Sequence, residues 1–317
     1  MFCNLRAVEI WSYAESRWQR GDLPGAELRW FDVCGTDNHE LDSLGERFGL
    51  HHLSIEDCLS RLVHAPKIDE FANHLFIVLH ALLPGSEGPE TEELDVFLGH
   101  DFLITYQDER VPATGAVAQI LDQGITVRPG ADGLLYEIAD RAVDAILPQV
   151  NELGEELDRL QEVVVRGRLN EDPNSAILAI RARAGQIRRL LLPQLTVTQR
   201  LSRGEFSVVT EGNRIYFRDI YDHLVRIDLA LEGLREDAEV ALSTYLAAIN
   251  NRMSEVMKVL SIVGALALPA VVIAGIFGTN FDNVPGLHSN WGFATMIGTM
   301  TALGGGMAYY FYRRGWF

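Results

Sequence analysis

The chain is poor in basic residues and in cysteine. It has 27 Lys and Arg against 44 Asp and Glu in 317 residues, which gives a formal net charge of −17. Because nucleic-acid binding depends on basic side chains that displace counterions, this balance argues against a nucleic-acid partner and suits a protein that meets cations. Cys3, Cys34 and Cys58 show no paired spacing, which indicates reduced thiols in a cytosolic body and no zinc-cluster motif.

Motifs of secreted proteins and of enzymes are missing as well. The N-terminal segment MFCNLRAVEIW lacks the apolar core between basic and small residues that marks a cleavable signal. No glycine-rich loop ends in Lys-Ser or Lys-Thr, so the sequence offers no ATP site. The histidines of the soluble part show no metal-ligand spacing and are interpreted as core or surface residues: His51, His52, His64, His74, His80 and His100. We therefore expect no enzyme activity.

Residues 1–130 show a mixed pattern of strands and helices. Alternating and β-branched runs predict strands, and a Gly-His-Asp turn predicts a hairpin: residues 26–33, 75–83, 94–98 and 102–106. Helical patterns occupy residues 37–48 and 53–62. Together they indicate a small mixed sheet covered by helices. The loop at 84–93 is rich in glutamate, which is more typical of a solvated loop than of a metal site: Glu87, Glu90, Glu92 and Glu93.

From residue 131 the pattern becomes helical. Residues 134–165 and 174–201 predict two long helices, paired antiparallel, within the segment 131–211. A third helix from residue 214 shows no stop before 277, a length on the order of 95 Å, and residues 212–258 are interpreted as a stalk. Its apolar seam either associates with copies of the chain or is buried against the two helices: Leu224, Ile227, Leu231, Leu234, Val240, Leu246 and Ile249.

The segment 259–317 contains two long uncharged runs. Residues 259–277 and 291–312 carry no charged side chain, and each is long enough as a helix to cross the roughly 30 Å core of a bilayer. Arg252 and Lys258 precede the first run, and Arg313 and Arg314 follow the second, whereas the loop between the two runs has no Lys or Arg. The positive-inside rule therefore predicts a multi-pass protein of the cell (inner) membrane with both termini in the cytoplasm.

One face of the first run is small or weakly polar. Its residues recur at spacings of three and four, which places them on one stripe of a helix: Ser254, Met257, Ser261, Gly264, Leu268, Val271 and Gly275. The stripe either packs against another membrane helix or lines a water-filled axis formed by several copies of the chain. A two-helix anchor that only holds a soluble domain at the membrane is a third interpretation.

Several segments are typical of one family of membrane proteins. They are APKIDEFANHLFIVLHAL (65–82), IYFRDIYDHLVRIDLALEGLRE (215–236), VMKVLSIVGALALP (256–269), AGIFGTNF (274–281), VPGL, NWGF and RRGWF. In this order, over most of the chain, they resemble the CorA type of two-helix divalent-cation transporters. The resemblance implies an α+β membrane protein with a cytosolic α/β/α domain, a stalk helix that continues into the first membrane helix, and a homopentameric funnel surrounded by membrane lipid. It also implies uptake of Mg2+, with Co2+ as a second ion, driven by the membrane potential.

The resemblance assigns the selectivity filter to Gly278, Thr279 and Asn280, where the family has Gly-Met-Asn. It implies that Asn280 side chains and backbone carbonyls around the axis hold a hydrated ion, because Mg2+ dehydrates reluctantly. Asp282 matches an acidic position at the outer mouth. On the residues alone, the safer interpretation is that Gly278 is a helix C-cap and Asn280 a loop residue, and the alternative for Asp282 is a turn residue.

The family also closes its pore when Mg2+ sits between neighbouring cytosolic domains. The resemblance carries Asp219 and Asp140 onto the sensing carboxylates, and the third partner stays open within residues 87–93. Two carboxylates that face each other repel until a cation bridges them, so cytosolic Mg2+ would stabilise the closed state. The alternative for Asp219 is an ion pair with one of three nearby arginines: Arg214, Arg218 and Arg226.

Two departures from the family bear on the choice of ion. Thr279 replaces the methionine of the triplet, and Ser254 stands where the inner pore mouth commonly has asparagine. Substituted triplets occur in the zinc-transporting branch, so Zn2+ is the runner-up to Mg2+. A membrane scaffold that senses cations without conducting them is the alternative of another class.

Overall fold

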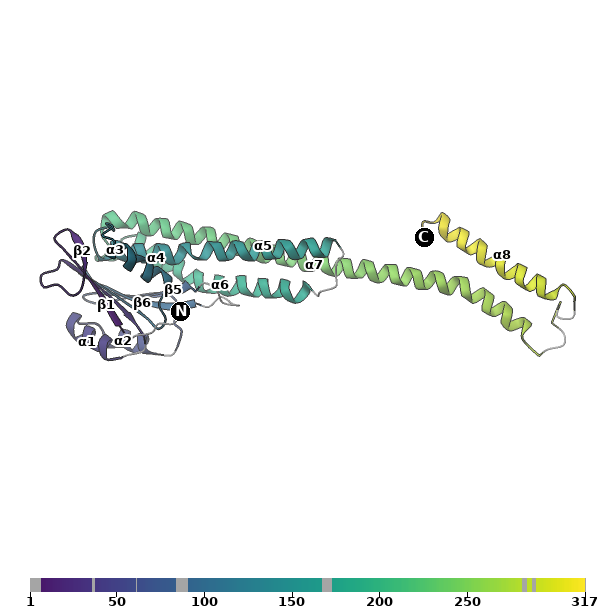
Figure 1. Ribbon diagram of the computed structural model, residues 1–317, viewed down its shortest axis with the longest axis horizontal. Helices are drawn as coiled ribbons and strands as arrows, with labels where there is room; N and C mark the ends of the chain where they lie inside the picture. Colours follow the sequence, from purple (N-terminus) through teal and green to yellow (C-terminus); the bar gives the residue numbers. More distant parts are fainter. Residues whose placement is uncertain are drawn as a thin grey trace. The chain divides into compact units, whose positions relative to one another are not determined.

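The computed structural model describes residues 7–35, 38–60, 62–83, 91–166, 173–280, 284–286 and 289–316. The chain divides into two compact units, Met1–Leu242 and Ser243–Phe317. Helix α7 (Glu211–Phe277) contributes residues to both units, so the predicted uninterrupted third helix is confirmed (Figure 1).

The first unit contains a mixed β-sheet. Among its described residues, seven strands pair in the order β2-β1-β3-β7-β6-β5-β4. Their bounds are β1 (Ala7–Ala14), β2 (Arg17–Arg20), β3 (Leu28–Cys34), β4 (Lys67–Glu70), β5 (Leu75–Leu82), β6 (Thr91–Leu98) and β7 (Phe102–Gln107). Strands β3 and β7 run parallel, and the other neighbours run antiparallel. The sheet and the β6–β7 hairpin were both predicted and are confirmed.

Helices cover both faces of this sheet. Figure 1 shows α1 (Asn38–Phe48) and α2 (His52–Leu59) on one face, and α3 (Pro112–Asp122) and α4 (Ala131–Asp144) on the other. Strand β5 is buried along its whole length, because successive side chains enter opposite hydrophobic clusters. Phe76 packs with Leu41 of α1, and Ile77 belongs to the cluster of Leu134 in α4. The α/β/α layering follows from this alternation.

Three longer helices continue the first unit. Helices α5 (Ile146–Val165) and α6 (Pro173–Ser202) lie beside the first part of α7 in Figure 1. The prediction for 174–201 is confirmed by α6. The prediction of a single helix over 134–165 is wrong, because α4 ends at Asp144 and α5 begins at Ile146. Ala145 between them keeps a helical backbone, so the pattern of the sequence shows no break there.

The apolar seam of α7 changes its environment along the helix. Leu224 and Leu231 are fully buried, in the same cluster as Leu157 of α5 and Ile187 of α6. Further along, Leu246 is 52% exposed. The first part of the seam is therefore covered by the chain's own helices, and the later part is left open.

The second unit consists of the end of α7 and of helix α8 (Gly292–Arg313). Among the described residues, α7 is the helix that is long and apolar enough to cross a membrane. Helix α8 matches the predicted second crossing in extent. Its apolar residues are interspersed with glycine and threonine, and it is not among the candidate membrane spans of the described residues. The first crossing is supported by α7, and the second crossing stays a prediction.

Candidate functional site

The C-terminal end of α7 is where the sequence predicts a selectivity filter. Gly278, Thr279 and Asn280 directly follow the helix, and all three are exposed. The Gly278 amide still donates to Ala274 O at 2.9 Å, and Thr279 Oγ1 donates to Ile276 O at 2.8 Å. These bonds fix the backbone of the first two residues, while the Asn280 amide is exposed to solvent.

The lack of a side chain at Gly278 lets its backbone lie close to the last turn of α7, and the residue is not a left-handed helix cap. Its backbone is not in the left-handed region, which the alternative role as a C-cap requires. A Cβ at this position would lie 3.1 Å from Ala274 O, tighter than an ordinary contact. The glycine therefore lets the chain leave the helix directly over its last carbonyl groups.

The predicted stripe of α7 is exposed along its whole length, as are most other residues of this part of the helix, among them Val259 and Val263. Every residue of the stripe is exposed, from Ser254 to Gly275, whereas Ile262 on the opposite face is buried and Leu266 is half-buried. Apart from the adjoining backbone of α7 itself, no atom of the described residues lies within 4 Å of a Cβ built at Gly264. The small residues of the stripe are therefore not explained by packing within one chain.

The acidic residues predicted at the two ends of the ion path are only partly described. Asp282 and residues 84–90, with Glu87 and Glu90, lie outside the described residues. Glu92 and Glu93 do not belong to a solvated loop, because strand β6 begins at Thr91 and includes both. Their carboxylates accept backbone N–H groups, Glu92 at 2.7 Å and Glu93 at 2.6 Å. The loop interpretation is wrong for these two residues.

The predicted sensing carboxylates, Asp140 on α4 and Asp219 on α7, both lie near the imidazole of His223. Ligand atoms of Asp140, Asp144 and His223 all lie within 4.8 Å of one another. His223 Nδ1 is 3.5 Å from Asp144 Oδ1, and His223 Nε2 is 3.8 Å from Asp219 Oδ2. The side chains of Asp144 and Asp219 are 62% and 55% exposed. Three carboxylates therefore surround one imidazole at the surface of the first unit.

The neighbouring groups in this cluster shift the pKa of Asp140 in opposite directions. Partial burial raises the pKa of Asp140, the nearby Asp144 carboxylate raises it further, and His223 lowers it. Among the described residues, His223 lies 3.8 Å from Asp219, and no arginine lies within ion-pair distance of this carboxylate. Carboxylate oxygens with an imidazole nitrogen are a ligand set that divalent cations accept. His223 was not predicted, although its spacing of four from Asp219 places both on one helix face.

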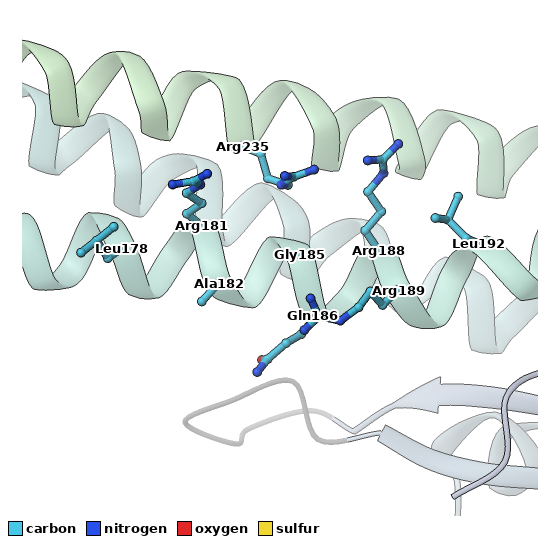
Figure 2. Close-up of a pocket in the computed structure, with 9 residues that line it drawn as sticks. All are labelled: Leu178, Arg181, Ala182, Gly185, Gln186, Arg188, Arg189, Leu192 and Arg235. Atoms are coloured by element: carbon cyan, nitrogen blue, oxygen red, sulfur yellow. The ribbon is translucent and has the colours of Figure 1, made fainter.

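One groove of the first unit is lined by basic residues. It has a volume of about 460 Å³ and lies along α6, with Arg181, Arg188, Arg189 and Arg235 in its lining. Figure 2 shows Arg181 and Arg188 pointing from α6 toward α7. Arg188 Nε donates to Asp228 Oδ1 at 2.7 Å, so part of this charge is neutralised within the chain. Guanidinium groups repel cations, and the groove is therefore not a cation site.

The described residues thus include an exposed stripe on an apolar helix, an exposed Gly-Thr-Asn end of that helix and a carboxylate cluster on the first unit. The profile of the family described as CorA-like Mg2+ transporter protein matches residues 25–313. The chain belongs to this family. The CorA family consists of ion transporters of membranes and not of enzymes, so the chain is a divalent metal cation transporter of the CorA family.

Individual relatives cover nearly the whole chain. The Bacillus subtilis protein YfjQ is 30% identical over 300 residues, which are 94% of this chain and 93% of YfjQ. The cobalt/magnesium transport protein CorA of Thermotoga maritima is 29% identical over 293 residues, 90% of this chain and 83% of its own. The zinc transport protein ZntB of an Enterobacter species is 23% identical over 83% of this chain and 80% of its own.

A solved structure shows the same fold. The complete structure of the CorA magnesium transporter from Methanocaldococcus jannaschii superposes with a TM-score of 0.87 at 21% identity, over 98% of both chains. The agreement includes the α/β domain and the long helix that the resemblance predicted. Because the identity is low, this likeness supports the fold of the CorA family and carries no residue roles.

Proposed function

We propose that the chain conducts Mg2+, with Co2+ as a second ion, into the cytosol through an axis formed by several copies of α7. One observation carries the proposal: the exposed stripe runs along α7 to Gly275 and ends at the exposed triplet Gly278 to Asn280. In an assembly of several copies, one continuous face thus joins the small and apolar side chains of the stripe to a ring of Asn280 amides. The names of the family and of its Thermotoga relative support these two ions.

At the filter, the ion keeps its water. Mg2+ demands near-octahedral oxygen coordination and loses its waters reluctantly, so a ring of Asn280 amide oxygens binds first-shell waters rather than the bare ion. Backbone carbonyls of the triplet add oxygen atoms to the same ring, because Gly278 has no side chain to block the approach of the ion. Asp282 then concentrates cations at the outer mouth by its charge.

The driving force is electrical. The free energy of a divalent ion falls by about 4.6 kcal/mol per 100 mV when it enters a cell with a negative interior, which is twice the value for a single charge. Uptake therefore needs no ATP site, in agreement with the lack of a phosphate-binding loop.

A homopentamer in the cell (inner) membrane provides the axis. A ring of amides needs several copies of the chain, and the open part of the α7 seam together with the stripe offers the faces for their contact. Helix α8 makes the second crossing, and both termini lie in the cytoplasm. The number five rests on the resemblance to the CorA family.

The carboxylate cluster on the first unit regulates the path. Cytosolic Mg2+ binds at Asp140 and Asp219, with His223 and Asp144 beside them, and holds neighbouring subunits in the closed state. The exposure of Asp144 and Asp219 leaves them accessible to a neighbouring subunit. When the ion leaves, mutual repulsion of the carboxylates loosens the contact. Asp219→Ala is then expected to transport normally and to respond less to internal Mg2+.

Zn2+ is the second candidate ion. Thr279 in place of methionine and the ZntB relatives favour it. The described filter, however, offers oxygen atoms and neither thiolate nor imidazole, and oxygen ligands suit Mg2+ better.

The test is ion flux into proteoliposomes that contain the purified chain, with Mg2+, Co2+ and Zn2+ offered in turn. We expect uptake that follows an inside-negative potential and is faster for Mg2+ and Co2+ than for Zn2+. Asn280→Ala should abolish it, and Asn251→Ala should leave it intact, because Asn251 is an exposed amide of α7 that lies off the stripe. A non-conducting scaffold predicts no flux of any ion in any of these proteins. If Zn2+ uptake is faster than Mg2+ uptake, the chain is a zinc transporter and the proposal for Mg2+ is wrong.

A further inference from the structure

The groove along α6 has the size and the lining of a site for a small anion. Its volume of about 460 Å³ is in the range of sites that hold small molecules. Ala182 and Gly185 form a low floor, because the first has a small side chain and the second has none. Around this floor, the described lining contains no carboxylate and four guanidinium groups: Arg181, Arg188, Arg189 and Arg235.

Carboxylates of α7 hold two of these arginines in place. Arg188 Nε donates to Asp228 Oδ1 at 2.7 Å. Arg188 Nη1 and Arg235 Nη1 meet at one oxygen atom, Glu232 Oε2. Figure 2 shows the Arg235 side chain extending from α7 toward α6, where Arg188 begins. Guanidinium groups that are already fixed lose little further freedom when a ligand binds, so the two are prepared for recognition.

Several guanidinium N–H groups of the groove are not used by the fold. A guanidinium group has five N–H donors. Among the described residues, Arg181 uses only Nη2, which lies 2.8 Å from Glu239 Oε1, and Arg189 has no hydrogen-bond or ion-pair partner. The carboxylates of Asp228, Glu232 and Glu239 balance three of the four positive charges. One positive charge and the unused donors therefore remain for a ligand.

Arg189 lies beside the floor of the groove. Its Nη1 is 4.0 Å from a Cβ built at Gly185, and the residue is exposed. The side chains of Arg181 and Arg235 are 40% and 33% exposed, so a ligand in solution can reach them as well. Arg181 and Arg189 are eight residues apart on α6, which is about 12 Å at about 1.5 Å per residue. A single phosphate is too short to contact both, and a chain of linked phosphates matches this spread better.

We propose that the groove binds a polyphosphate anion, either inorganic triphosphate or the triphosphate group of a nucleotide. The planar fork of a guanidinium group matches two phosphate oxygens at once, with two parallel charge-assisted hydrogen bonds. Leu178 and Leu192, at the two ends of the groove, offer apolar surface to the base of a nucleotide. The site belongs to the first unit and does not depend on the proposed ion path.

The test is isothermal titration calorimetry of the full chain in detergent with sodium tripolyphosphate, ATP and adenosine. The buffer contains no divalent cation, so that a phosphate cannot bind through a metal ion. We expect one tripolyphosphate or one ATP per chain and no binding of adenosine. Tighter binding of ATP than of tripolyphosphate identifies a nucleotide as the ligand, and equal affinities identify the phosphate chain alone. The proposal is overturned if tripolyphosphate does not bind, or if adenosine binds as tightly as ATP.

Two pairs of variants locate the binding in the groove. Arg189→Ala breaks no ion pair of the described residues and is expected to weaken tripolyphosphate binding about tenfold, because a charged donor is lost. The matched variant Arg203→Ala removes an exposed arginine outside the groove and should leave the affinity unchanged. Equal weakening by both would show attraction to the general surface charge and would overturn the proposal.

The second pair blocks the groove without removing a contact. Gly185→Glu places a carboxylate on the floor, four residues before Arg189, and should abolish binding. The fold should tolerate it, since a Cβ at Gly185 meets no described atom closer than 4.0 Å and glutamate favours a helix more than glycine. Gly154→Glu is the matched control on α5, where a Cβ meets open space, and should bind as the unmodified chain does. Binding that persists in Gly185→Glu would overturn the proposal.

Discussion

Asp32 on β3 is buried in the sheet, and its carboxylate makes stability depend on pH. Thr105 Oγ1 and Gln107 Nε2 donate to Asp32 Oδ1 at 2.8 Å and 2.7 Å, and Arg110 Nη2 lies 3.5 Å from Oδ2. Burial nevertheless dominates and raises the pKa of Asp32 from 3.8 to about 6. Between pH 3.8 and about pH 6, the folded chain therefore holds a proton on Asp32 that the unfolded chain has already released.

The sign and the size of the effect follow from linkage. A carboxyl group with a raised pKa in the folded state favours folding below pH 3.8, and this stabilisation is lost as the pH rises through about 6. The difference of about 2.2 between these pKa values corresponds to about 3 kcal/mol at 1.36 kcal/mol each. Asp32→Asn cannot titrate, while its amide oxygen can still accept the two hydrogen bonds. The free energy of unfolding of the unmodified chain should thus fall by up to about 3 kcal/mol relative to the variant between pH 4 and pH 7.

The assay is denaturant unfolding of the full chain in detergent, followed by tryptophan fluorescence at several pH values. Trp30 Nε1 donates to Thr105 Oγ1 at 3.0 Å, so a buried fluorophore reports on the same network. The difference between the two proteins removes the titration of all other groups, and Asp101→Asn, at an exposed turn, controls for the loss of one charge. A difference that stays constant with pH, or that grows in the opposite direction, would refute the reasoning.

Three further predictions concern the helices. Leu231→Ala should lower the free energy of unfolding by about 2–5 kcal/mol, and Leu229→Ala by less than about 0.5 kcal/mol, because Leu231 is 0% and Leu229 66% exposed; equal losses in denaturant titrations would contradict the described burial. Gly278→Ala should reduce Mg2+ flux, since its Cβ would crowd Ala274 O, whereas Gly304→Ala meets open space and should not; the flux assay decides between them. His223→Ala should require a higher internal Mg2+ concentration for half-maximal inhibition of uptake, and an unchanged inhibition curve would remove this residue from the regulatory cluster.

The elements that the sequence predicts well are those with a strong and uninterrupted periodicity. The buried run of β5, the β6–β7 hairpin and helices α6 and α7 agree with the predictions to within a few residues. The layered α/β domain follows from the alternation of these patterns. Gly278 to Asn280 could be located because they follow the first of the two long uncharged runs and resemble the family's triplet.

The missed elements lack the usual local signals. The hairpin of β1 and β2 turns at Glu15 and Ser16, whose φ angles are 53° and 63°, where glycine or asparagine is usual. Strand β4 has only four residues, and α3 is rich in residues of low helix propensity. His223 was missed for another reason: its partner Asp144 comes from α4, and a contact between distant segments is not visible in a local pattern.

The measurement that tests the central claim most directly is the block of ion flux at single cysteines placed on α7. In a chain without its native cysteines, Leu268→Cys lies on the exposed stripe, and Leu266→Cys lies on the partly covered face. If the stripe lines the ion path, a membrane-impermeant thiol reagent will stop Mg2+ uptake through Leu268→Cys and leave Leu266→Cys unaffected. Unblocked uptake through Leu268→Cys, or equal block at both positions, would contradict the account.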